Sequence, residues 1–218
     1  MKKLVVITGA SRGLGLITAK EFAANNWQVA GTGRSEQSLD FPTDATYHRF
    51  DASNATESES FWGHLKEEYP EAQICLVNNA GGYVSGSLIE TKAEAYATQI
   101  QSSYFSAVYM TRGLALNFSK ARIINIVSTS ALAAHKNNSA YGAAKAAEMH
   151  FFQSLQEEFK PAQYQITNLY PSDIATHGAD PDAIKPEDLA RFVREQADNE
   201  STYYLRDVTV YPVGLVIK

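Results

Sequence analysis

A glycine-rich turn directly after a short apolar run is the feature that most constrains this chain. Residues 4–7 (Leu-Val-Val-Ile) predict a buried strand, because both faces of the run are apolar. Gly9, Gly13 and Gly15 follow, and the apolar spacing of residues 16–22 predicts a helix. Glycines let backbone N–H groups approach a phosphate, and a helix N-terminus adds partial positive charge there. The turn therefore favours dinucleotide binding over an ordinary strand-to-helix connection.

Strand and helix patterns alternate along the rest of the chain. Strands of this kind, joined through helices, form right-handed crossovers and a parallel sheet with helices on both faces. We therefore predict an α/β fold with a doubly wound, mostly parallel sheet in one domain spanning residues 1–218. The predicted strands are residues 4–7, 27–32, 47–50, 74–77, 122–127, 165–170 and 208–211, and the predicted helices are residues 16–22, 57–69, 93–116, 141–159 and 185–193.

Composition excludes several classes of function. The net charge of −5 argues against a nucleic-acid partner, which requires a basic face. The single cysteine, Cys75, cannot form an intrachain disulfide, and no spacing of His, Cys or carboxylate residues matches a metal-ligand pattern. No stretch approaches the roughly 18 apolar residues of a membrane span, and the apolar run at residues 4–7 is too short for a signal peptide. We expect a cytoplasmic enzyme without a membrane partner.

Tyr141 and Lys145 lie four residues apart in a predicted helix, and so about one turn apart on one face. A phenol exchanges protons sluggishly near neutral pH, and a neighbouring ammonium stabilises its phenolate and suits it to general acid–base work. Small residues surround the pair, which leaves room for a flat ligand; the alternative is a surface Tyr–Lys pair. Ser128, at the end of a predicted strand, could bond a substrate oxygen, or it could be an ordinary turn serine.

Five motifs stand along the chain: Thr8-Gly9-x-x-x-Gly13-x-Gly15, Asn78-Asn79-Ala80-Gly81, Ser128, Tyr141-x-x-x-Lys145 and Pro171. In order and spacing, and over essentially the whole chain, they resemble the compact branch of the short-chain dehydrogenase/reductase family. The resemblance implies a Rossmann-type domain that transfers hydride between a nicotinamide cofactor and a carbonyl/secondary-alcohol pair.

The resemblance also implies catalytic roles. Tyr141 would be the general acid/base, Ser128 would hold the substrate oxygen, and Lys145 would favour the Tyr141 phenolate and bond the nicotinamide ribose. The family commonly carries an asparagine in the long helix that contributes to a kink and a water-linked proton path. Ser103 stands at that position here, and a serine can still bond water or backbone.

The expected cofactor site extends over several strand ends. Asp51 and Ala52 would contact the adenine, Asn79 to Gly81 would line the adenosine and ribose side and steady the central strand, and Thr176 would bond the carboxamide of a nicotinamide flanked by Pro171 and Ile174. The full expected set is Gly9, Ser11, Arg12, Gly13, Leu14, Gly15, Arg34, Asp51, Ala52, Asn79, Ala80, Gly81, Tyr141, Lys145, Pro171, Ile174 and Thr176.

Cofactor choice follows from the end of the second predicted strand. An NAD-selective site places an acid there to bind the ribose 2′-OH, but this chain has Gly33 followed by Arg34. Two guanidinium groups, Arg12 and Arg34, suit a 2′-phosphate, unless both simply face solvent. We predict NADP(H) in preference to NAD(H).

Further expectations concern the substrate cover, the partners and the alternative functions. Residues 172–186 would cover a small-molecule substrate. His135 is predicted to be a surface loop residue, and the same is predicted of His177. By resemblance, the helices over residues 93–116 and 141–159 would form a homodimer or homotetramer. The alternatives are a non-catalytic NADP(H)-binding sensor or scaffold of the same fold, and an NAD-dependent alcohol dehydrogenase.

Overall fold

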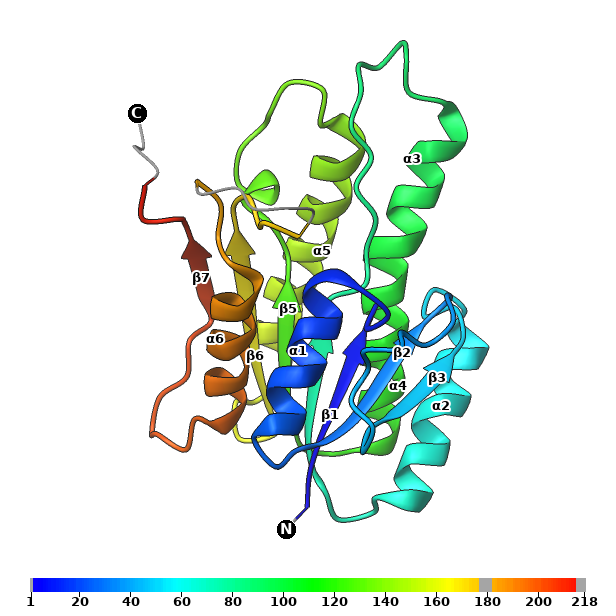
Figure 1. The fold of residues 1–218 in the computed structure, drawn as a ribbon, viewed down its shortest axis with the longest axis vertical. Helices are drawn as coiled ribbons and strands as arrows, with labels where there is room; N and C mark the ends of the chain where they lie inside the picture. The colour runs from blue at the N-terminus through cyan, green and yellow to red at the C-terminus, as the bar shows by residue number, and fades with distance from the viewer. Residues whose placement is uncertain (1, 177–181, 215–218) are drawn as a thin grey trace.

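A computed structural model of the chain describes residues 2–176 and 182–214. Within these residues, seven strands form one parallel sheet in the order β3-β2-β1-β4-β5-β6-β7 (Figure 1). The strands are β1 (Lys3–Thr8), β2 (Gln28–Gly33), β3 (Thr46–Arg49), β4 (Gln73–Asn78), β5 (Ala121–Ile126), β6 (Tyr164–Pro171) and β7 (Asp207–Val210). Each predicted strand is present to within one or two residues at either end, and the predicted doubly wound fold is confirmed.

Every pair of successive strands is connected through at least one helix, except β2 and β3, which are joined by a loop. The helices are α1 (Gly13–Ala24), α2 (Ala55–Glu68), α3 (Ala93–Ile100), η1 (Gln101–Phe105), α4 (Ser106–Asn117), η2 (Thr129–Ala131), α5 (Ser139–Glu158) and α6 (Pro186–Asp198). Asn54 caps α2 by accepting hydrogen bonds from the main-chain N–H groups of Thr56 and Glu57. Pro186 stands in the first turn of α6, where its missing N–H costs no helical bond.

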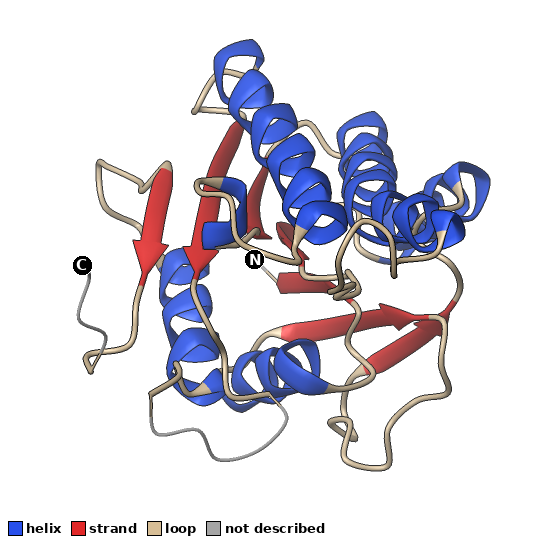
Figure 2. Ribbon diagram, turned by 90° about the horizontal axis from the view of Figure 1, so that it is seen from above, coloured by secondary structure: helices blue, strands red, loops and turns tan. Residues whose placement is uncertain are grey.

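The sheet separates two hydrophobic cores, because alternate residues of a strand point to opposite faces. Val5 and Ile7 of β1 point toward α1 and α6, where they meet Phe22 and Val193 among others. Leu4 and Val6 point to the other face, which α2, α4 and α5 cover with residues such as Trp62. Figure 2 shows helices on both sides of the strands.

The single helix predicted over residues 93–116 contains a π-helical segment. Residues 101–105 form η1, between α3 and α4, with helical backbone at the junctions on both sides. A π-segment widens one turn by a residue and occurs most often at functional sites. Ser103 lies inside it, where the family asparagine was expected to contribute to a kink.

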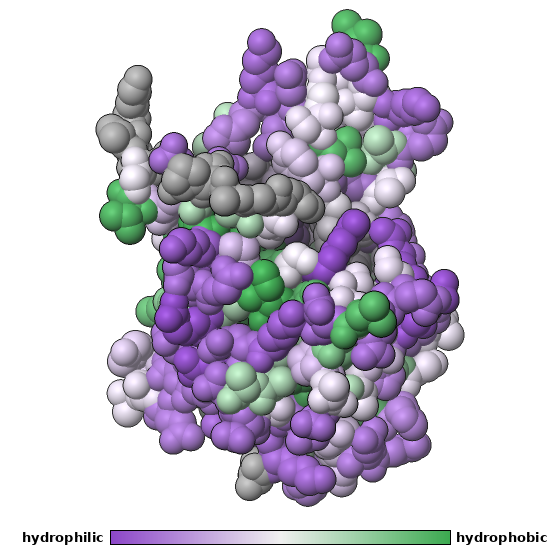
Figure 3. All heavy atoms as spheres, in the orientation of Figure 1, coloured by the Kyte–Doolittle hydropathy of each residue, from purple (hydrophilic) through white to green (hydrophobic). Residues whose placement is uncertain are grey.

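The surface seen in Figure 3 is largely hydrophilic over α1 and α6, with a hydrophobic spot at the tip of the loop that precedes α3. Leu88 and Ile89 in that loop are 74% and 96% exposed. Among the described helices, none is both long and apolar enough to cross a lipid bilayer.

The strand order reverses between β1 and β4, which are hydrogen-bonded neighbours although they are far apart in the chain. In open parallel sheets, ligands bind outside the carboxyl ends of the strands at such a switch point. The turn after β1 and the segment after β4 both open at that edge.

Candidate active site

The turn between β1 and α1 leaves little room for a side chain at Gly9 or at Gly15. Gly9 has a φ of +67°, in the left-handed region that favours glycine. A Cβ on Gly15 would stand 2.3 Å from the Gly9 carbonyl oxygen, so the start of α1 lies directly against the turn. The first turn of α1 carries no acidic side chain, which leaves the positive end of the helix open to an anion.

Two side chains join this turn to the end of β4. The Thr8 hydroxyl accepts hydrogen bonds from the main-chain N–H groups of Asn79 and Ala80, each at 2.9 Å. Asn79 Nδ2 donates to the carbonyl oxygens of Thr8 at 2.9 Å and Gly9 at 3.3 Å. Asn79 therefore steadies the turn through its side chain, and its neighbours Ala80 and Gly81 border the space in front of the turn.

A cavity of about 390 Å³ opens at this edge of the sheet, a volume in the range of small-molecule sites. All of the expected site residues except Ser103 line it, although they come from seven separate stretches of the chain. The expected residues in its wall are Gly9, Ser11, Arg12, Gly13, Leu14, Gly15, Arg34, Asp51, Ala52, Asn79, Ala80, Gly81, Ser128, Tyr141, Lys145, Pro171, Ile174 and Thr176.

The three candidate catalytic side chains reach the cavity from β5 and α5. Ser128 follows β5 and is 8% exposed; its Oγ accepts a hydrogen bond of 3.1 Å from the Ser130 N–H, which leaves its own O–H available to donate. Tyr141 lies in the first turn of α5, and Lys145 one turn further on. Ser128, Tyr141 and Lys145 therefore line the same cavity as the glycine turn.

Lys145 is 4% exposed and its ammonium is held on two sides. Nζ donates hydrogen bonds of 2.8 Å to the Ile126 carbonyl oxygen at the end of β5 and of 2.8 Å to Glu148 Oε2. Burial by itself lowers the pKa of Lys145, but the negative charge of Glu148, the phenol of Tyr141 and the hydrogen bond from Nζ to Glu148 outweigh it, so the pKa stands above its ordinary value. Lys145 is therefore protonated at neutral pH.

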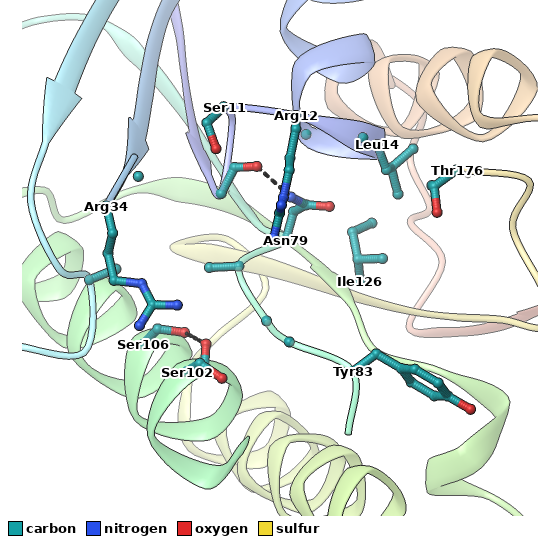
Figure 4. Close-up of a pocket in the computed structure, with 18 of the residues that line it drawn as sticks. Ser11, Arg12, Leu14, Arg34, Asn79, Tyr83, Ser102, Ser106, Ile126 and Thr176 are labelled. Atoms are coloured by element: carbon teal, nitrogen blue, oxygen red, sulfur yellow. Dashed lines mark hydrogen bonds between the residues drawn. The ribbon is translucent and has the colours of Figure 1, made fainter. Parts of the chain in front are cut away.

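Arg12 and Arg34 stand on two sides of the cavity (Figure 4). Both are exposed, Arg12 at the start of α1 and Arg34 just after β2. No acid stands at the end of β2: a Cβ added to Gly33 would lie 2.4 Å from the Tyr47 hydroxyl, which occupies that place and donates to the Ser35 carbonyl oxygen at 3.0 Å. Near the end of β2 the cavity is lined by Ser11, Arg34 and Ser35.

Ser103 does not line the cavity. It is fully buried in η1, and its Oγ accepts a hydrogen bond of 2.9 Å from Gln99 Nε2. It lies behind Gly81, because a Cβ on that glycine would be 3.0 Å from Ser103 Oγ and 3.9 Å from Lys145 Nζ. The bond from Gln99 leaves the Ser103 O–H available to donate, so a water-linked proton path through this position stays a prediction.

Several residues that line the cavity were not predicted from the sequence, among them Tyr83. Tyr83 is 69% exposed, and its ring meets the Tyr141 ring edge-on, with centroids 5.0 Å apart. Figure 4 shows Tyr83 at the opposite end of the site from Arg34. Its position just after the Asn78–Gly81 motif was the available signal. Ser102 and Ser106 also line the cavity, from η1 and α4, and no local pattern marks them.

Two histidines considered from the sequence play no described part in this site. His135 is exposed in the loop between η2 and α5. His177 and the middle of the expected substrate cover, residues 177–181, lie outside the described residues.

Comparison with known proteins places this geometry in a family. A model of the short chain dehydrogenase family matches residues 3–185, so the chain belongs to that family of oxidoreductases. An uncharacterized oxidoreductase of Staphylococcus saprophyticus is 28% identical, with 97% of each chain covered.

Two other similar proteins have a cofactor in their descriptions. The NADPH-dependent 1-acyldihydroxyacetone phosphate reductase of Saccharomyces cerevisiae is 28% identical over 82% of this chain and 63% of its own length. The structure of a metagenomic short-chain oxidoreductase in complex with NADP is 25% identical, with 97% of each chain covered and a TM-score of 0.83.

Proposed function

We propose that this protein interconverts a carbonyl and a secondary alcohol with NADP(H) as the hydride carrier. The observation that carries the proposal is the shared cavity, in which Ser128, Tyr141 and Lys145 face the space bordered by the glycine turn. Family membership supports oxidoreduction in general. The cavity supports the particular chemistry.

The cofactor fits the residues that are present. The close approach of Gly15 to Gly9, the acid-free start of α1 and the two arginines form a cradle for phosphate groups. A bound nicotinamide cofactor would supply or accept the hydride. Asp51 and Ala52 would border its adenine, while Ile174 and Thr176 would border its nicotinamide end.

The protein's own groups would handle the proton and the developing charge. The Ser128 O–H, oriented by the bond from Ser130, would donate to the substrate oxygen. Tyr141 would deliver a proton to that oxygen in reduction and remove it in oxidation. Lys145, protonated beside it, would stabilise the phenolate left on Tyr141.

Preference for NADP(H) is the second part of the proposal. Arg12 and Arg34 present two guanidinium groups, which bind phosphate oxygens in a bidentate manner, and Tyr47 fills the place of an acid at Gly33. The yeast relative is NADPH-dependent and the metagenomic structure holds NADP. Assembly as a homodimer or homotetramer, and location in the cytoplasm, stay predictions from the sequence.

The test is a fluorescence titration with NADPH and with NADH, followed by NADPH oxidation with a panel of aldehydes and ketones. We expect tighter binding of NADPH, and a loss of about tenfold or more in NADPH affinity in Arg34→Ala with NADH affinity unchanged. Arg191→Ala, which removes an exposed arginine from α6, is the matched control.

Turnover separates an enzyme from a sensor. Oxidation of NADPH that depends on an added carbonyl, and that falls at least a hundredfold in Tyr141→Phe while NADPH still binds, would support catalysis. Tight NADPH binding without turnover of any carbonyl would favour the sensor or scaffold, and NADH preference would favour the NAD-dependent alternative.

A further inference from the structure

A buried carboxylate, Glu148, lies three residues beyond Lys145 on α5. Its side chain is 1% exposed, and its Oε2 accepts the 2.8 Å hydrogen bond from Lys145 Nζ. Removing a carboxylate from water is costly unless an opposite charge and hydrogen bonds compensate it. The proton transfer proposed above does not use this group, although it touches the ammonium on which that transfer depends.

Glu148 and the Ile126 carbonyl oxygen together fix the direction of the Lys145 ammonium. An ammonium has three N–H donors, and these two acceptors, each at 2.8 Å, take two of them. Lys145 also lines the cavity. The third donor is therefore the one left for a ligand or for Tyr141.

We propose that Glu148 is a positioning residue: it holds the Lys145 ammonium against Ile126 and partly neutralises its charge, and so limits how strongly Lys145 favours the Tyr141 phenolate. This inference rests on the proposed function, which gives Tyr141 the proton transfer.

Glu148 is the dominant charged neighbour of Lys145. Among the described residues, the titratable neighbours that act on Lys145 are Glu148 and Tyr141. Burial raises the pKa of Glu148, and the charge and hydrogen bond of Lys145 oppose this rise. The elements packed against α5 are η2, α3, η1 and β6. Their other titratable groups have contacts elsewhere or are exposed: Tyr96 with Ser139, Tyr104 with Phe151, Tyr164 with Phe118, Tyr170 with Asp207, and Glu94 at the exposed start of α3. The ring of Tyr83, in the loop between β4 and α3, contacts the Tyr141 ring.

The sign of the effect follows from the net charge. Lys145 and Glu148 together bring no net charge to Tyr141, whereas Lys145 beside a neutral residue 148 brings one positive charge. That positive charge favours loss of a proton from the coupled Tyr141–Lys145 pair, whether the phenol or the ammonium group releases it. Removing the carboxylate should therefore lower the pH at which the pair titrates.

The test is an NMR titration of the full chain labelled with tyrosine carrying ¹³C at Cζ, with the Tyr141 resonance identified by its loss in Tyr141→Phe. In Glu148→Gln, which keeps an acceptor for Lys145 and removes the charge, we expect the Tyr141 midpoint to fall by about one pH unit. Glu158→Gln, the same change at the exposed end of α5, should leave the midpoint in place. An unchanged midpoint in Glu148→Gln would overturn the proposal.

A second comparison covers the case in which Glu148→Gln does not fold because Lys145 loses its counter-ion. Lys145→Met/Glu148→Gln carries neither buried charge and should fold. Its Tyr141 midpoint should lie close to that of the wild-type protein, because in both proteins residues 145 and 148 together bring no net charge to Tyr141; a midpoint one pH unit or more above the wild-type value would again overturn the proposal. Since the readout requires no turnover, failure of the carbonyl panel would refute the proposed function and leave this titration readable.

Discussion

At the scale of single residues, Gly15 has the least room for a side chain in the glycine turn. A Cβ there would lie 2.3 Å from the Gly9 oxygen and 2.5 Å from Asn79 Nδ2, so Gly15→Ala must push the turn away from the end of β4. We expect the free energy of unfolding to fall by about 2 kcal/mol, measured in urea, and the NADPH affinity to fall at least tenfold.

Gly63 is the matched control, because nothing lies within 4 Å of a Cβ added at this position in the middle of α2. Gly63→Ala should raise the free energy of unfolding by about 0.5–1 kcal/mol, since alanine loses less backbone freedom in a helix. Equal stability of Gly15→Ala and the wild-type protein would contradict the account of the turn.

At the scale of elements, a row of buried amides joins β4, β5 and β6. Asn78, Asn125 and Asn168 lie at the same register, and their side chains bond in sequence at 2.9 and 2.8 Å. A slip of one strand by a single residue would break this row, so it specifies register in addition to the apolar pattern. Asn168 continues the row to Asp207 of β7 at 3.1 Å.

Asn125→Leu should lower the free energy of unfolding by about 2–3 kcal/mol, because it removes one hydrogen-bond partner of Asn78 and one of Asn168, and Asn125 is fully buried. Urea unfolding followed by circular dichroism measures this loss. Gln28→Leu, a polar-to-leucine change at an exposed position of β2, should stay within about 0.5 kcal/mol. A comparable loss in both variants would indicate that strand composition, and not the amide row, is responsible.

At the scale of the whole molecule, Asp198 connects the end of α6 to the beginning of the chain. Its Oδ1 accepts hydrogen bonds from Lys3 Nζ at 2.8 Å and Trp27 Nε1 at 3.2 Å, and its Oδ2 accepts one from Arg194 at 3.2 Å. Burial alone raises the pKa of Asp198, but the bonds from Lys3 and Arg194 outweigh it and hold the pKa below its ordinary value.

A carboxyl group with a lowered pKa in the folded state stabilises the protein above the pKa of the unfolded chain, about 4, and loses this effect as the pH falls through the folded value. Asp198→Asn should therefore lower the free energy of unfolding by about 1 kcal/mol at pH 7, a modest value because Asp198 is partly exposed to solvent. Below pH 4 the loss should become progressively smaller. Urea unfolding at pH 7 and pH 3 tests this, with exposed Asp44→Asn as the control. A difference between wild type and Asp198→Asn that does not shrink in acid would contradict it.

The sequence by itself determined the elements and the edge of the sheet where the site would form. Strand and helix periods are local properties, and the strand ends at Gly9, Asn79, Ser128 and Pro171 must meet at one edge once the strands are parallel. That is why nearly every expected site residue lines one cavity.

Only the tertiary structure decided which side chains support that site. Tyr47 fills the place beside Gly33, Tyr83 meets Tyr141, and η1 buries Ser103 behind Gly81 instead of in the cavity. Glu148 lies on the same helix as Lys145, but the proposed effect of its charge on Lys145 depends on burial of the pair by other elements. Each of these contacts depends on how distant segments pack, a long-range outcome that no local spacing of residues encodes.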